Sequence, residues 1–100
     1  SATSLLNFLS IKENNMATTY EINMFETDSV NSSKTMVTFK VTDTTNNKIL
    51  VITKSVTTGS NTNAEICTAA QTAAQTEINA WVASNALIGK TWNPDTSEIK

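Results

Sequence analysis

The chain has 100 residues and a formal net charge of −2, and it contains no His, no Arg and a single Cys, Cys67. Imidazole, guanidinium and thiolate groups carry most proton transfer, phosphate binding and metal binding near neutral pH. Their scarcity disfavours most catalytic mechanisms and predicts no metal and no cofactor. The seven positive charges are all lysines without a basic stripe, which argues against nucleic acid and against a polybasic membrane contact.

Composition also limits the architecture. A length of 100 residues corresponds to one small domain, and 39% apolar residues suffice for one core between a sheet and a helix. No apolar run approaches the ~18 residues of a membrane span. Ser, Thr and Asn supply 40 residues, which predicts a neutral surface rich in hydrogen-bonding groups. One Cys forms no internal disulfide, so secretion is neither indicated nor excluded.

Residues 1–15 are predicted to form an N-terminal apolar arm or short helix, set apart from the rest by Asn14-Asn15 and Met16. A helix of two to three turns is too short to be stable alone, so it must dock. It either covers the second face of the sheet in the same chain or docks on a neighbouring copy. Its candidate interaction residues, most of them at helical spacing, are Leu5, Leu6, Phe8, Leu9 and Ile11.

Residues 16–88 are predicted to form the folded domain, and it begins with three strands. In the first, over 18–27, Tyr20, Ile22 and Met24 alternate with polar residues. The second, over 35–43, shows the cleanest alternation, and Asn46-Asn47 then favours a tight hairpin. The third, over 48–57, is apolar on both faces at 49–52, which predicts cover on both sides, by this chain or by a partner.

A long helix over about 63–87 is predicted next. Thr62 and Glu65 fit a capping box at its start, and Gly89 fits its termination. Residues 89–100 are predicted to be a polar C-terminal tail. The apolar stripe that should face the sheet comprises Ile66, Ala70, Ala73, Ala74, Ile78, Trp81 and Val82.

The expected fold class is therefore α+β. It comprises a three-stranded antiparallel β-meander packed on one long C-terminal helix, with a short N-terminal helix added to this β-β-β-α core. Within it, Trp81 is expected to anchor the helix in the core. Trp92 lies in the polar tail, where an aromatic side chain either folds back as a lid or anchors a partner.

The candidate chemical groups are weaker signals. Cys67 lies in the first turns of the helix without a His or a second Cys, so a small buried or half-buried side chain is expected. Paired carboxylates support acid–base chemistry only at a fixed separation across a cleft. The spacing of the carboxylates instead predicts solvated faces and turns for Glu21, Glu26, Asp28 and Asp43.

The run Met16-Ala17-Thr18-Thr19 before a Thr-rich meander, and the run Thr76-Glu77-Ile78-Asn79-Ala80-Trp81-Val82, carry a resemblance. Over about residues 16–88 the chain resembles small accessory proteins of marine tailed phages. This chain departs from that pattern in its Ala-rich helix and its extra N-terminal segment. The resemblance implies a phage-encoded, virion-associated or accessory role and transfers no active-site residue.

We therefore expect a non-enzymatic structural or protein-interaction module that self-associates as a homo-oligomer or docks on a larger assembly. The alternatives are a monomeric binding or inhibitor domain that presents the sheet or Trp92, and a secreted filament subunit. A phage-encoded protein would lie in the virion or the host cytoplasm. A chain whose start follows a cleaved signal peptide would be extracellular.

Overall fold

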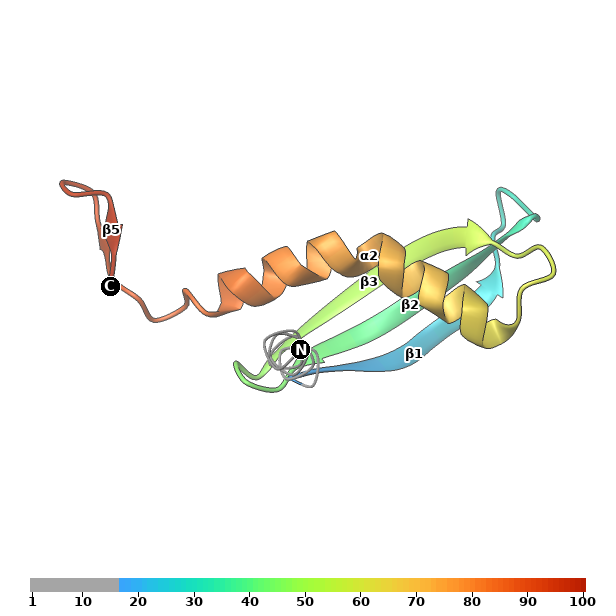
Figure 1. Ribbon diagram of the computed structural model, residues 1–100, viewed down its shortest axis with the longest axis horizontal. Helices are drawn as coiled ribbons and strands as arrows, with labels where there is room; N and C mark the ends of the chain where they lie inside the picture. The colour runs from blue at the N-terminus through green and yellow to red at the C-terminus, as the bar shows by residue number, and fades with distance from the viewer. Residues whose placement is uncertain (1–16) are drawn as a thin grey trace, which may run out of the picture.

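The computed structural model describes residues 17–100, so the predicted arm of residues 1–15 and its helix lie outside the described residues. A meander of three antiparallel strands precedes one long helix, which confirms the predicted α+β class and its β-β-β-α order (Figure 1). The elements are β1 (Thr18–Thr27), β2 (Lys34–Asp43), β3 (Lys48–Thr57), α2 (Asn63–Asn85), β4 (Trp92–Asn93) and β5 (Glu98–Ile99).

The sheet has the order β1-β2-β3, so β2 is the central strand. Val41 of β2 lies opposite Tyr20 of β1 and opposite Leu50 of β3. The turn between β2 and β3 places Asn47 in the left-handed region with φ 56°, as the Asn-Asn pair predicted. Adjacent strands joined by short turns bring the residues of the meander together locally.

A bulge interrupts β1 and corrects one part of the predicted alternation. Ile22 lies opposite Phe39, but the next pair joins Met24 to Thr38, so Asn23 is an extra residue. Met24 therefore points to the face opposite to that of Tyr20 and Ile22. Phe25, opposite Val37, takes its place on the helix side. The simple period of two had placed Met24 with Tyr20 and Ile22, because an inserted residue leaves no mark in an alternating pattern.

The core lies between one face of the sheet and α2, which packs against β3 and β2. The ring of Tyr20 meets that of Phe39 edge-on, with centroids 5.6 Å apart. Trp81 and Val82 pack against the core while partly exposed, as expected of a helix anchor. The fully buried apolar residues are few: Val37, Phe39, Val41, Ile66, Ala70, Ala74 and Ile78.

The helix begins as predicted and ends earlier. Thr62 Oγ1 accepts the backbone N–H of Glu65, and the Glu65 carboxylate accepts the N–H of Thr62, which forms the capping box. The last helical residue is Asn85 rather than residue 87. Ala73 is exposed, which corrects its place in the predicted stripe, because the buried set follows positions 66, 70, 74 and 78.

The C-terminal residues, which were predicted to be a polar tail, form a small hairpin. Strands β4 and β5 pair with each other, and backbone hydrogen bonds link Thr91 and Lys100 in both directions. A turn in which Ser97 has φ 55° connects the strands. The hairpin stands away from the sheet beyond the end of α2 (Figure 1). The sequence did not indicate these strands, because a strand of two residues is too short to show the alternation of apolar and polar residues.

Candidate functional site

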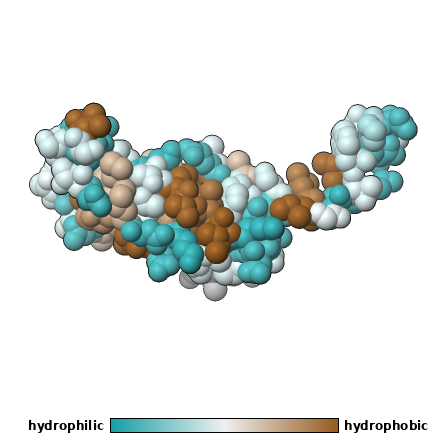
Figure 2. Space-filling view, turned by 180° about the vertical axis from the view of Figure 1, so that it is seen from behind, coloured by the Kyte–Doolittle hydropathy of each residue, from teal (hydrophilic) through white to brown (hydrophobic). Residues whose placement is uncertain are grey.

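The face of the sheet that α2 does not cover is the first candidate surface. We define this open face by Met24, Met36, Ile49 and Val51. The side chains of Ile49 and Val51 are 59% and 60% exposed, and the two methionines are half-buried. Seen from this side, apolar side chains gather over the middle of the sheet within a polar surround (Figure 2). Residues 17–100 leave this face of β3 uncovered, so the expected cover on both faces, by this chain or by a partner, stays a prediction.

The two edges of the sheet differ. Within residues 17–100, β1 and β3 each pair on one side only. Strand β1 contains a bulge and carries two exposed glutamates, Glu21 and Glu26. Both the bulge and the charges hinder pairing with a further strand. Strand β3 is ten residues long and pairs with β2 without a register shift. The edge of β3 therefore presents a regular row of unpaired N–H and C=O groups.

A groove between β1 and α2 is the second candidate surface. We use the name β1–α2 groove for two hollows between these elements: Tyr20 and Val82 line one of them, and Ile22, Phe25 and Cys67 line the other. It exists because the backbone of α2 approaches β2 and β3 but not β1. Ile22 is 53% exposed and Phe25 37%, so the helix side of β1 remains largely open.

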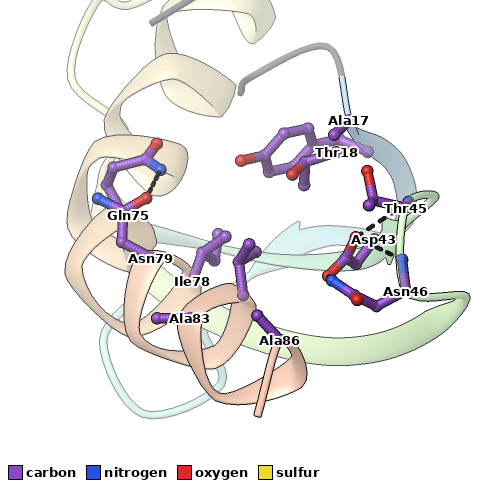
Figure 3. A pocket seen from close by; sticks show the side chains of 12 residues that line it. Ala17, Thr18, Asp43, Thr45, Asn46, Gln75, Ile78, Asn79, Ala83 and Ala86 are labelled. Carbon is purple, nitrogen blue, oxygen red and sulfur yellow. Dashed lines mark hydrogen bonds between the residues drawn. The ribbon is translucent and has the colours of Figure 1, made fainter. Parts of the chain in front are cut away.

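The wider part of the groove is a hollow of about 540 Å³ near the start of β1. Figure 3 shows Ala17 and Thr18 on one side of it, Ile78 and Asn79 on the other, and Asp43 at its end. The Gln75 amide donates to Asn79 Oδ1 at 2.8 Å, so two of the polar side chains along the helix already bind each other.

The narrower part is a hollow of about 290 Å³ near the start of α2. Ile22 and Phe25 lie on the strand side, and Ala64 and Cys67 lie on the helix side. Apart from Asn63 at the start of α2, the described lining is apolar or weakly polar, so the hollow suits an aliphatic side chain better than a charged ligand. The Cys67 thiol is half-buried, as expected for a small side chain at this position.

Asp43 is the one carboxylate that the chain buries among the described residues, with 1% exposure. Its Oδ1 accepts the backbone N–H groups of Thr45 and Asn46, both at 3.1 Å. Its Oδ2 accepts the side-chain amides of Asn46 at 2.8 Å and Asn85 at 3.1 Å. Burial raises the pKa of Asp43, but these four hydrogen bonds outweigh it and hold the pKa below the ordinary value. Asp43 therefore ties the β2–β3 turn to the end of α2 rather than serving as a proton donor.

The remaining predicted carboxylates lie on the surface. Asp28 accepts the Ser55 hydroxyl at 2.6 Å and the Val30 N–H at 2.8 Å, and these hydrogen bonds lower its pKa. Glu21 faces Lys40 at 3.9 Å. Asp28 and Asp43 flank opposite ends of β2, roughly 30 Å apart at the usual rise of a strand. Residues 17–100 hold no group of three acidic or thiol side chains placed for a metal ion.

Trp92 is 58% exposed on β4, away from the open face and from the groove, so the structure does not bring it together with them. Leu5, Leu6, Phe8, Leu9 and Ile11 lie outside the described residues. Sequence reasoning missed the β1–α2 groove, because its opening depends on where α2 crosses the sheet. The sequence signal that could have found it is Phe25, an apolar residue out of phase with Tyr20 and Ile22.

No helix within residues 17–100 has the length and apolar character needed to cross a membrane. Comparisons with protein-family models, with curated proteins and with solved structures gave no match. The resemblance to phage accessory proteins thus stays a prediction from the sequence.

Proposed function

We propose that this protein is a non-enzymatic interaction module that associates with a second copy of itself along β3 and the open face. One observation carries the proposal: Ile49 and Val51 are each more than half exposed on a ten-residue strand whose outer backbone groups have no strand partner within residues 17–100. An edge of this length is a template for another strand. Burying the part of Ile49 and Val51 that is still exposed contributes about 1–2 kcal/mol each, so association has a driving force at this edge.

The charges around β3 are compatible with a copy of the same chain as the partner. Lys54 forms an ion pair with Glu77, and Lys40 on the open face is compensated by Glu21. Two identical surfaces of this kind meet without strong like-charge repulsion, which a surface of one sign would impose. The hydroxyl groups of Thr38 and Thr53 are hydrogen-bonded to each other across β2 and β3, with the two oxygens 2.6 Å apart. Removing water from these two hydroxyls on association therefore costs little.

In the phage setting that the sequence resemblance implies, such a module would join a virion or an accessory assembly. The alternative of a monomeric binding domain is favoured by Trp92, which is 58% exposed on a hairpin that projects from the domain (Figure 1). An exposed Trp at such a site suits a protein partner with an apolar pocket.

The test is the solution mass of the full chain by light scattering over a concentration series. We expect a dimer for the native chain and a monomer for Val51→Lys. Thr72→Lys is the matched control, since Thr72 is exposed on α2, on the side of the sheet away from the open face. Circular dichroism confirms that both variants fold. A native chain that is monomeric throughout the series contradicts the proposal, as does a Val51→Lys variant that associates like the native chain.

Tryptophan fluorescence tests the alternative. If the protein is a monomer with a free Trp92, acrylamide should quench a large part of its emission, and Trp92→Phe should remove that accessible part. Trp81 packs against the core and supplies the protected part. Emission that is protected in the native monomer and unchanged in Trp92→Phe rules out the alternative.

A further inference from the structure

The described residues leave the β1–α2 groove without an occupant. Residues 17–100 contribute seven buried apolar side chains to the core, two of them alanines, while Ile22 and Phe25 beside it stay exposed. A core this small is marginal for a domain of this length. Further burial on the helix side of β1 would therefore add stability where the domain needs it.

We propose that the N-terminal arm of the same chain fills this groove, with Leu5, Leu6 and Leu9 against β1 and α2. This inference does not depend on self-association, because the groove is on the helix side of the sheet and the proposed dimer surface is not. It also differs from the expectation that the arm covers the sheet's second face, which is the open face.

The point of attachment supports the groove. The arm joins the described chain at Ala17, and Ala17 itself lines the wider hollow. The Ala17 carbonyl accepts the Thr44 N–H and the Thr44 hydroxyl, both at 2.8 Å, which fixes the start of β1 at this opening. The arm therefore begins at the mouth of the groove rather than on the open face.

The length of the arm matches the groove. Five residues, 12–16, separate Ile11 from Ala17 and span up to about 17 Å when extended. The helix predicted over 5–11 would add about 10 Å. With the linker fully extended, the sum would reach along β1 past Ile22 to Phe25, which lies roughly 25 Å from Ala17 at the usual strand rise. Leu5 would thus lie nearest Cys67, and Leu9 nearer the wider hollow.

The chemistry also matches. The arm carries Lys12 and Glu13, so its side chains have no net charge, and its apolar residues are aliphatic or aromatic. The narrower hollow offers Ile22, Phe25 and Ala64 as partners. On the open face the apolar residues alternate with Thr and with the Glu21–Lys40 pair. A leucine-rich helix would remove water from these polar groups without offering them hydrogen bonds in exchange. A short tether also gives the groove of the same chain an effective arm concentration of order mM.

Cys67 makes the proposal testable, because it is the only thiol in the chain and it lines the groove. In Leu5→Cys, mild oxidation should join position 5 to Cys67 within one chain, since a disulfide needs Cβ atoms about 4 Å apart. Matched controls are Asn7→Cys, on the opposite side of the predicted helix, and Thr96→Cys, in the C-terminal hairpin. Intact mass and non-reducing gels identify the product.

An intramolecular disulfide that forms at least ten times faster in Leu5→Cys than in either control supports the proposal. A disulfide between two chains in Leu5→Cys overturns it in favour of an arm exchanged between copies. Equal rates in the three variants also overturn it, because they show no preferred place for the arm.

A second measurement uses the native thiol. Leu5→Gln/Leu6→Gln/Leu9→Gln should raise the rate at which Cys67 reacts with a thiol reagent at least five-fold, while Ser4→Gln/Asn7→Gln/Ser10→Gln leaves the rate unchanged. An equal rate in the native chain and in the apolar-to-polar variant contradicts docking in the groove. Should that variant not fold, the disulfide measurement decides, since it changes one arm residue only. A monomeric mass in light scattering would reject self-association and leave both thiol results intact.

Discussion

The buried Asp43 shows how a single residue joins two distant parts of the chain. Its carboxylate accepts hydrogen bonds from the β2–β3 turn and from Asn85 at the end of α2, 42 positions later. A buried charge is tolerated only when such donors satisfy it. Sequence reasoning assigned Asp43 to a solvated face or turn. It missed the burial because the partner, Asn85, is polar and lies at the end of the helix.

Acid should weaken the fold partly through Asp43. Its folded-state pKa lies below 3.8, the ordinary value that applies in the unfolded chain. The stability that its ionised form contributes is therefore complete above pH 3.8 and is lost as pH falls through the folded-state pKa. Asp43→Asn should lose about 1.5–3 kcal/mol at neutral pH and show a weaker acid dependence than the native chain.

Urea unfolding between pH 2 and 7 measures both effects. Glu26→Gln serves as the control, because Glu26 is an exposed carboxylate on β1. An Asp43→Asn variant whose stability falls with acid as steeply as that of the native chain would show that other groups control the acid transition.

Thr62 sets the start of α2. Thr62→Ala should lower stability by about 0.5–2 kcal/mol, because the backbone N–H of Glu65 loses its acceptor. Thr72→Ala is the matched control on the exposed side of the helix, where Ala is the better helix former and no loss is expected. The unfolding midpoint in urea reports both, and equal midpoints for native and Thr62→Ala would place the functional start of the helix elsewhere.

At the scale of the element, α2 lies close to the sheet because alanines face it. Ala70 and Ala74 have no exposed surface, while Ala73 is exposed. Ala74→Leu should cost about 1–3 kcal/mol through overpacking, whereas Ala73→Leu should be nearly neutral. Thermal unfolding compares the two variants, and equal melting temperatures would mean that the helix can shift away from the sheet freely.

The three strands should tolerate charge very differently. Val41 is fully buried on β2, so Val41→Asp places an unpaired charge in the core and should abolish cooperative folding. Val51 is 60% exposed at the edge, so Val51→Asp should leave a folded monomer. Had β3 been central, Val51→Asp would prevent folding instead. Circular dichroism on heating distinguishes these outcomes, and loss of folding in Val51→Asp would show that β3 is covered on both faces in solution.

The elements were predictable to within a few residues because each has a strong local signal. Alternation marks the three strands, and Thr62 with Glu65 marks the start of the helix. The strand order follows from short turns between neighbours. The bulge at Asn23 and the β4–β5 hairpin lacked such signals, because one inserted residue or a two-residue strand changes no period. Which face of β3 stays open depends on the line that α2 takes across the sheet.

At the scale of the whole molecule, stability should be concentrated on one side. The amides of β2 pair on both sides and lie over the core, so they should exchange hydrogen most slowly. The amides of β4 and β5 form a separate two-stranded sheet without a buried side chain and should exchange fastest among the hydrogen-bonded strands. Hydrogen exchange followed by mass spectrometry measures this order, and slow exchange in the hairpin would reveal that it docks on the domain or on a partner.

The candidate surfaces were only partly predictable. Composition indicated a neutral surface without catalytic groups, and the apolar run at 49–52 indicated a strand that needs cover. Neither pattern locates the β1–α2 groove, because the groove arises from the distance between β1 and α2, which no local sequence pattern encodes. Ile22 and Phe25 on one side of the groove are more than 40 residues away in the chain from Cys67 on the other side.

The bulge in β1 has a consequence for how many copies can join. It disturbs one edge of the sheet and leaves the other regular. A sheet with two regular edges could add chains at both ends without limit and grow into a fibre. Within residues 17–100, β3 is the only regular edge, so two copies related by a twofold axis would pair their β3 strands and leave no second regular edge free in that part of the chain. One extra residue, Asn23, would thereby set a stoichiometry of two and protect a Thr-rich sheet from open-ended aggregation.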